Sequence, residues 1–122
     1  MKSIIVSMIA TAGLMVAGSV LAEDMPELAK KSGCTACHAV DKKIVGPAWA
    51  DVGKAYNTTH VTSTGKKTAD ILQGKSAEDY LVEKVSKGGS GNWGSVPMTG
   101  HPNLSEADAK QILKYIFLLK NK

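Results

Sequence analysis

The sequence contains no arginine, although 15 lysines give it a formal net charge of +4 at pH 7. Proteins that bind nucleic acids commonly cluster arginines, because the planar guanidinium group matches the geometry of phosphate. Here the lysines are dispersed from Lys30 to Lys122, as on an ordinary solvated surface. The composition therefore predicts no nucleic-acid partner.

Aromatic residues are also scarce, at 5% of the 122 residues. A hydrophobic fraction of 43% and a mass of 12.8 kDa are typical of one globular domain and exclude a disordered chain. A domain of this size buries a limited area, and six aromatic side chains give it a thin core. A large flat cofactor buried among the helices would fill that deficit.

An apolar run without charge, from Ile4 to Ala22, follows Lys2. A positive start, an apolar run and a small-residue site at Val20–Ala22 are the parts of a secretory leader. A run of this length could also just span a bilayer as an uncleaved anchor, but its two glycines and the small-residue site favour cleavage. We therefore expect a cleaved signal peptide at 1–22, export to the periplasm, and a mature domain at 23–122. The mature chain would carry 14 lysines against 11 acidic residues, a formal charge of +3.

Helix signals dominate the mature chain, and strand signals are missing. Pro26 begins a short helix that ends at Gly33, and a second candidate begins at Pro47. A third helix follows a cap at Ser76 and the last follows a cap at Ser105, because each serine precedes an aspartate by three positions. The pattern predicts an all-α domain.

Two long segments separate these helices. Residues 57–74 are rich in threonine, lysine and glycine, and we expect a solvated excursion that Ile71 and Leu72 pin to the domain. Residues 88–104 contain five glycines, and a structureless loop of that length is uncommon in a small domain unless it binds something. The second segment is therefore a candidate binding loop.

Two cysteines, Cys34 and Cys37, are the whole cysteine content, and His38 follows them directly. In this C-x-x-C-H pattern the two thiols add across the vinyl groups of haem, and the histidine binds the iron. A thioredoxin-like redox pair needs a preceding strand, structural zinc needs four ligands whereas His60 and His101 are isolated, and a simple disulfide leaves His38 without a role. The motif predicts one covalently attached haem c per chain.

The second axial position of the iron decides between electron transfer and ligand chemistry. Leader cleavage leaves two methionines, and Met25 is too close to the attachment motif to reach the opposite haem face. Met98, in the glycine-rich segment, is the favoured ligand, with His60 and His101 as the alternatives. The glycine and proline on either side of His101 restrict its backbone.

Several blocks in order along the chain resemble the small bacterial class I cytochromes c of the cytochrome c-551/c-552 type. The resemblance covers nearly all of the mature chain apart from Asn57–Gly74. The blocks are Leu28–Gly33 leading into Cys34–His38, Val45–Ala48, Gly88–Gly94, Val96–Met98 and Ser105–Ala109.

The resemblance implies a class I cytochrome c fold with about four short helices wrapped around one haem. In this fold the first and last helices cross, with Gly33 allowing close approach and Tyr115 at a position where such chains place an aromatic residue. Two departures stand out. The family commonly follows its methionine with Pro-Pro-Asn, whereas Thr99–Asn103 follow Met98 here, and the Asn57–Gly74 segment is longer than the usual connection.

The resemblance also assigns supporting roles around the haem. The Pro47 carbonyl would accept a hydrogen bond from the ring N–H of His38, which fixes the nitrogen that meets iron. Trp93 would donate a hydrogen bond to a haem propionate, and Lys84 would neutralise that acid. His38 and Met98 would be the metal ligands.

The function implied is that of a monohaem electron carrier rather than an enzyme, soluble and monomeric, working between respiratory redox partners. A haem enzyme or gas-binding protein with an open sixth position is one alternative, and a haem-bearing subunit of a larger respiratory complex is another. We expect redox partners to dock briefly around the exposed haem edge. The expected contact residues are Ala36, Ile44, Val45 and Met98, with Lys42 and Lys43 on the rim.

Overall fold

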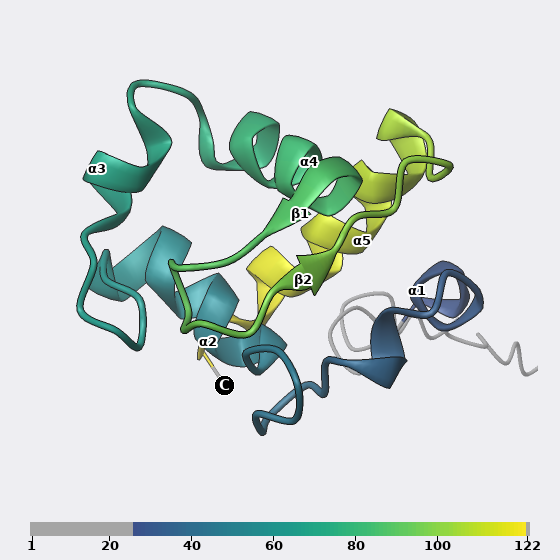
Figure 1. Cartoon of the computed structure of the whole chain (residues 1–122), viewed down its shortest axis with the longest axis horizontal. Coiled ribbons are helices and arrows are strands. Elements are labelled where there is room, and N and C mark those ends of the chain that lie inside the picture. The colour runs from purple at the N-terminus through teal and green to yellow at the C-terminus, as the bar shows by residue number, and fades with distance from the viewer. Residues whose placement is uncertain (1–25, 122) are drawn as a thin grey trace, which may run out of the picture.

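The computed structural model describes residues 26–121, so the expected leader and its cleavage site lie outside the described residues. The α-helices of this part are α1 (Glu27–Lys31), α2 (Trp49–Lys54), α3 (Thr68–Leu72), α4 (Ala77–Lys87) and α5 (Glu106–Leu118) (Figure 1). Shorter helical turns are η2 (Cys34–Ala36), η3 (Ala55–Thr59) and η4 (Leu119–Asn121). Two short strands, β1 (Gly88–Gly89) and β2 (Met98–Thr99), pair antiparallel. The described part of the chain is therefore mainly helical, as the sequence predicts.

The two longest helices begin at the serines that the sequence marks as caps. The Ser76 hydroxyl accepts a hydrogen bond from the amide of Asp79 at 3.1 Å, and the Ser105 hydroxyl accepts one from the amide of Asp108 at 3.1 Å. Each bond satisfies one of the amides that a helix N-terminus leaves without a partner. The predicted starts of α4 and α5 are therefore confirmed.

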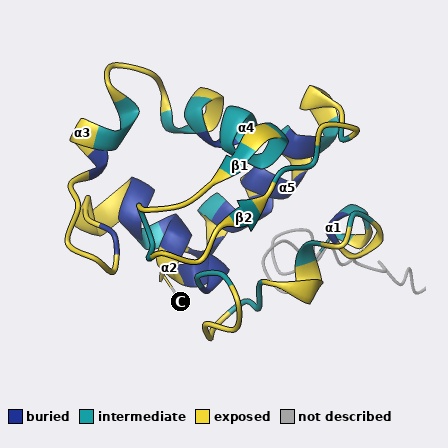
Figure 2. Ribbon diagram, viewed as in Figure 1, coloured by how far each residue is buried: buried dark blue, intermediate teal, exposed yellow. Residues whose placement is uncertain are grey.

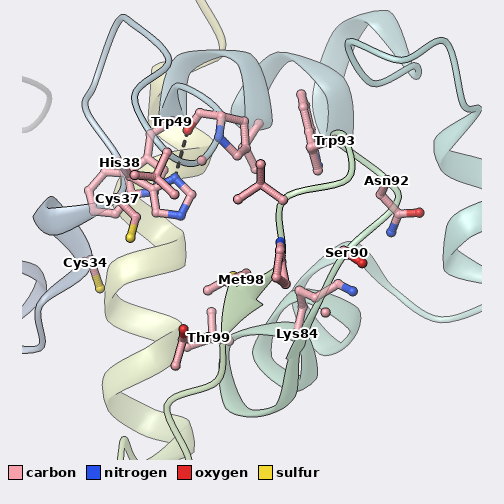
Figure 3. A pocket seen from close by; sticks show the side chains of 18 of the residues that line it. Cys34, Cys37, His38, Trp49, Lys84, Ser90, Asn92, Trp93, Met98 and Thr99 are labelled. Atoms are coloured by element: carbon pink, nitrogen blue, oxygen red, sulfur yellow. Dashed lines mark hydrogen bonds between the residues drawn. The ribbon is translucent and has the colours of Figure 1, made fainter.

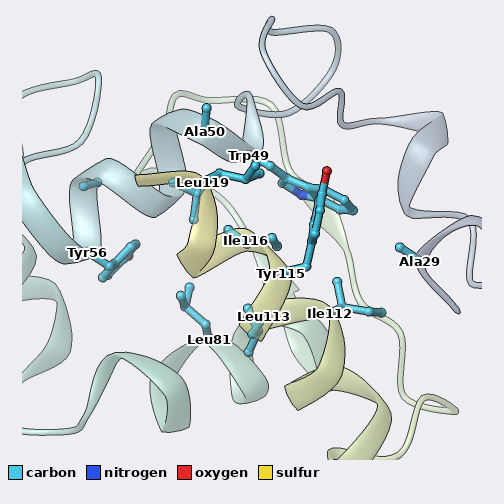
Figure 4. Close-up of a cluster of buried hydrophobic side chains, with 12 residues drawn as sticks. Ala29, Trp49, Ala50, Tyr56, Leu81, Ile112, Leu113, Tyr115, Ile116 and Leu119 are labelled. Carbon is cyan, nitrogen blue, oxygen red and sulfur yellow. The ribbon is translucent and has the colours of Figure 1, made fainter. Parts of the chain in front are cut away.

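Helix α5 forms the centre of the core and contacts α1, α2 and α4. Its buried face includes Ile112, Leu113 and Ile116, which lie among buried side chains of the neighbouring helices (Figure 4). The backbones of α2 and α5 approach closely, because a Cβ at Gly53 would lie 2.5 Å from the carbonyl oxygen of Ile116. The burial colours of Figure 2 follow this arrangement, with the dark blue segments concentrated on α2 and α5.

Helix α1 packs against α5, and its Ala29 is fully buried in the core. The expected role of Gly33 in this contact is wrong, because a Cβ at Gly33 would meet no atom within 4 Å. Gly33 instead follows α1 with φ +82°, a left-handed conformation that glycine adopts without steric cost. Tyr115 is buried and packs edge-on against Trp49, with ring centroids 6.2 Å apart and planes inclined by 74°.

The β1–β2 ribbon and α3 differ from the sequence-based expectation. Two-residue strands leave no alternating pattern to recognise, and α3 is only five residues long and begins without a side-chain cap. Within 57–74, Ile71 and Leu72 are both half-buried, and Leu72 packs against the core as predicted. In residues 26–121, no helix has the length and apolarity needed to cross a bilayer.

Candidate cofactor-binding cavity

The turn η2 brings two thiols and an imidazole together immediately after α1. The amides of Cys37 and His38 both donate to the carbonyl of Cys34, at 3.2 and 3.0 Å. Both cysteines are free thiols, with Cys34 half-buried and Cys37 exposed. Figure 3 shows Cys34, Cys37 and His38 grouped on one side of a cavity. The local backbone therefore presents three chemically distinct groups to the same space.

The imidazole of His38 is fixed by a hydrogen bond to the Pro47 carbonyl, at 2.8 Å from Nδ1. A carbonyl oxygen only accepts, so Nδ1 carries the proton and Nε2 keeps the lone pair that a metal requires. Trp49 stacks beside the ring, with centroids 5.8 Å apart and planes inclined by 24°. The chain thus selects one tautomer and one orientation of His38.

Gly46 also contributes to the site, although the sequence alone did not indicate its role. A Cβ at this position would lie 2.5 Å from Cε1 of His38, so the ring occupies space that only glycine leaves open. Trp49 was likewise expected only as part of a helix face. The proximity of Gly46 and Trp49 to Pro47 in sequence could have drawn attention to both, since the segment had to lie against the imidazole for the Pro47 bond to form.

Burial lowers the pKa of His38 below its ordinary value of 6.5, and repulsion from His101 lowers it further against the opposing effect of the Pro47 bond. The neutral ring, which is the form that donates to a metal, is therefore favoured. Burial likewise raises the pKa of the Cys34 thiol above 9.0, and the nearby Cys37 adds to this shift against a backbone hydrogen bond. Before any bond is made to it, Cys34 is a protonated thiol at neutral pH.

The cavity has a volume of about 510 Å³ and lies between η2, α2, α4, α5 and the segment from β1 to β2. This volume falls within the range of roughly 300–1,000 Å³ common for bound small molecules and cofactors. Its lining is mainly apolar and, among residues 26–121, includes no aspartate or glutamate, whereas Lys43 and Lys84 both contribute to it. All seven expected site residues line it, namely Cys34, Cys37, His38, Pro47, Lys84, Trp93 and Met98.

Met98 enters this cavity from β2, opposite Gly89 of β1, and is half-buried. Of the two alternative ligands, His101 also lines the cavity, but its amide is tied to the Val85 carbonyl at 2.8 Å. His60 is exposed and is not part of the lining. The structure therefore brings Met98 and His101 to the cavity with His38 and leaves His60 away from it.

An aromatic and amide cluster closes the end of the cavity near Trp93. The indole N–H of Trp93 donates to the Tyr56 hydroxyl, and the Asn92 amide donates to the Tyr80 hydroxyl at 2.7 Å. The two tyrosine rings stack with centroids 6.4 Å apart. Burial, aided by Tyr80 and opposed by the Trp93 bond, raises the pKa of Tyr56 to about 12. Asn92 is a further member of the site that the sequence did not indicate, after Gly46 and Trp49.

Lys84 brings an ammonium group to the same end. Its Nζ lies 5.9 Å from the centroid of the Tyr80 ring, and a Cβ at Gly89 would lie 2.8 Å from it. Among residues 26–121, no carboxylate forms an ion pair with Lys84. The cation is therefore available to an acidic group of a bound molecule.

The donor set fits haem better than it fits the alternatives considered for the cysteines. Within the described part of the chain, no group of three or more histidine, cysteine or acidic side chains is placed to hold a metal ion, which disfavours structural zinc. Residues 26–33, which precede Cys34, form α1 and a turn rather than a strand. An apolar cavity with two thiols and a ring nitrogen at one side and a thioether entering from another element matches a covalently held porphyrin.

Comparison with known proteins supports the same interpretation. The family model described as cytochrome c matches residues 22–120. The chain is 40% identical to cytochrome c-552 of Hydrogenobacter thermophilus, over 98% of both chains. It is 41% identical to cytochrome c-551 of Allochromatium vinosum, over 84% of this chain and 92% of that protein. The crystal structure of wild-type Nitrosomonas europaea cytochrome c552 superposes with a TM-score of 0.58 at 38% identity, covering 77% of this chain and 98% of that one.

Proposed function

The chain belongs to the cytochrome c family, so its cofactor is one covalently bound haem c, and we propose that it carries single electrons between redox proteins of the periplasm. Haem c supplies the redox chemistry, because its iron changes by one charge between two oxidation states. The chain itself transforms no substrate in this proposal. Residues 1–22 act as the export leader, and residues 23–122 are the mature carrier.

Four side chains hold the cofactor. The thiols of Cys34 and Cys37 would form thioethers to it, and Nε2 of His38 and the sulfur of Met98 would bind the iron. The 2.8 Å bond from His38 to Pro47 supports this assignment, because it leaves Nε2 free to coordinate. A thioether ligand stabilises the reduced iron and raises the reduction potential relative to harder donors.

The polar groups at the far end of the cavity hold the acidic edge of the cofactor. Lys84 neutralises a propionate, and Trp93 gives it a hydrogen bond in place of the bond that its indole now makes to Tyr56. No described residue of the lining is acidic, which supports this placement, because an anionic group would meet no like charge from residues 26–121 there. The apolar walls exclude water, so a change of iron charge requires little reorganisation of the surroundings.

Partners approach along the apolar rim of the cavity. Val45 and Val96 both line the cavity and are exposed at 47% and 60%. The neighbouring Ile44 is exposed at 44%, and Lys43 stands beside them. A small apolar contact with a few cations at its edge suits a short-lived redox encounter.

One observation carries the proposal: the C-x-x-C-H side chains and Met98, which lie far apart in sequence, line a single cavity. The test is the absorption spectrum of the purified mature protein in both oxidation states, compared with the Met98→Ala variant. We expect the oxidised wild type to show the sulfur-to-iron charge-transfer band and the variant to lack it. The Met25→Ala variant is the control, and its spectrum should match that of the wild type.

Two results would contradict the proposal. Removal of the pigment by acid-acetone would show that no covalent attachment exists. Rapid carbon monoxide binding to the reduced wild type, together with an oxidised spectrum that lacks the sulfur band, would indicate an open sixth position and a ligand-binding or catalytic protein.

A further inference from the structure

The segment between α2 and α3, expected to be a solvated excursion, folds into a closed turn. The amide of Thr62 donates to the Lys66 carbonyl at 2.9 Å, the amide of Gly65 donates to the Thr62 carbonyl at 2.9 Å, and the amide of Thr68 donates to the His60 carbonyl at 2.9 Å. Thr62 and Thr68 are each only 4% exposed. We call residues 60–67 the clasp. Its hydrogen bonds give it a defined shape that a solvated excursion would lack.

The tip of the clasp contacts the loop between β1 and β2, residues 90–97. The Thr64 hydroxyl donates to the Asn92 carbonyl at 2.9 Å, although the two residues are 28 positions apart. Thr64 has one hydroxyl proton, so the Thr62 hydroxyl is the donor in its 3.0 Å bond to Thr64. Figure 1 shows this segment, before α3, beside the turn of the β1–β2 loop. Thr62 therefore orients the Thr64 hydroxyl toward the loop.

The β1–β2 loop needs such external support. Gly91 and Gly94 in the loop, and Gly88 and Gly89 directly before it in β1, all have positive φ, and glycine loses more conformational freedom on folding than any other residue. One backbone hydrogen bond closes a turn inside the loop, from the Gly91 amide to the Gly94 carbonyl at 2.8 Å. The loop also leads directly into Met98. Its conformation decides where the Met98 sulfur lies.

The contacts that fix the loop meet at Asn92. Its carbonyl accepts a hydrogen bond from Thr64, and its side-chain amide donates one to Tyr80. Tyr80 belongs to α4, whereas Thr64 belongs to the clasp. Two separate parts of the chain thus converge on the loop tip.

We propose that Thr64 is a positioning residue, whose hydroxyl holds the β1–β2 loop in the conformation that keeps Met98 in the cavity. The inference rests on the proposed function in taking Met98 as an axial ligand. In this proposal the clasp limits the movement of the β1–β2 loop, and of Met98 with it, away from the cavity. The iron would then exchange Met98 for a foreign ligand less readily than the glycine-rich loop alone would allow.

The test is imidazole binding to the oxidised holoprotein, because imidazole enters only when Met98 leaves. Thr64→Val keeps the shape of the side chain and removes the hydroxyl. Its apparent imidazole affinity should rise by about twofold to tenfold, the factor that one neutral hydrogen bond supplies. Thr64→Ser should restore the wild-type affinity.

Thr58→Val is the matched control. Thr58 is also exposed, and its hydroxyl donates from η3 to the carbonyl of Lys54, the last residue of α2, at 3.0 Å rather than to the loop. Equal imidazole affinities in Thr64→Val and Thr58→Val would overturn the positioning role. The proposed function would stand in that case, provided that Met98→Ala binds imidazole more tightly than the wild type.

If Met98→Ala binds imidazole no more tightly than the wild type, the axial assignment fails. Hydrogen exchange of the Gly91 amide then tests independently whether the clasp holds the β1–β2 loop, because this amide forms the hydrogen bond that closes the turn of the loop. Faster exchange in Thr64→Val than in Thr58→Val would support the hold on the loop, and equal exchange would overturn it.

Discussion

The environment of the His38 ring shows how single residues prepare the site. Pro47 fixes the proton on Nδ1, Trp49 stacks on the ring, and Gly46 leaves the space that the ring occupies. Each contact restricts a different freedom of the imidazole: its tautomer, its tilt and its position. A ligand that is already oriented loses little further entropy when it binds a metal.

Tyr56 gives a pH dependence that can be measured. Its folded pKa of about 12 exceeds the ordinary value of 10.0, so above pH 10 the unfolded chain loses the phenol proton before the folded chain does. The resulting stabilisation is complete below pH 10 and is lost as the pH rises through about 12. Tyr56→Phe lacks this group. Between pH 10 and about pH 12, the free energy of unfolding should therefore fall less in the variant than in the wild type, by up to about 2 kcal/mol.

Denaturant unfolding of both proteins across this interval, with tyrosinate absorbance followed in parallel, checks the prediction. Curves of unfolding free energy against pH that run parallel for wild type and variant would contradict it.

Elements with local causes were predictable from sequence, and elements with tertiary causes were not. The starts of α4 and α5 depend on a serine and an amide three positions later, both visible in the sequence. The β1–β2 ribbon depends on distant backbones that approach at Gly88 and Gly100. The clasp depends on Thr68 and His60 meeting across a turn, and nothing in the order of the threonines indicates that pairing.

The N-cap of α5 provides a prediction for a single helix. Ser105→Ala removes the acceptor for the Asp108 amide, so the free energy of unfolding should fall by about 1 kcal/mol. Because α5 contacts α1, α2 and α4, the loss should appear in the global unfolding transition. Chemical denaturation of the holoprotein measures it.

Ser105→Asp is the control for that experiment. Aspartate also accepts at a helix N-cap and carries a charge that the helix N-terminus favours, so this variant should keep wild-type stability. Equal destabilisation by alanine and aspartate would show that the serine acts by some contact other than the cap.

At the scale of the whole molecule, the site depends on residues from both halves of the chain. The C-x-x-C-H motif was recognisable alone, because its spacing is set by the cofactor rather than by the fold. Met98 could be chosen from sequence because few methionines compete with it. The cavity that joins them, and the contact between the clasp and the β1–β2 loop, arise only from the packing of α2, α4 and α5.

The exposed apolar rim of the cavity predicts the surface through which two molecules of this protein meet. Val45 lines the cavity, whereas Leu118 does not, although both are 47% exposed. Electron self-exchange between the oxidised and reduced forms needs no other partner, and NMR line broadening measures its rate. Val45→Ala should slow self-exchange several-fold, and Leu118→Ala should leave it unchanged, because burial of the apolar rim brings the two haem edges together.

Ionic strength should change this rate only mildly. Residues 23–122 have a formal charge of +3, which two ionised propionates would lower to about +1, so repulsion between two such molecules would be weak. Equal rates in Val45→Ala and Leu118→Ala would place the contact on a different face.

The pairing of Met98 with Gly89 restricts which substitutions the β1–β2 ribbon can tolerate. Neighbouring residues of a strand point to opposite sides, so a slip by one position would turn the sulfur outward and put Thr99 in its place. Gly88 and Gly100 guard against this slip, since any side chain there would collide with the facing backbone. A side chain at either position should therefore disturb the register that keeps the Met98 sulfur on the cavity side.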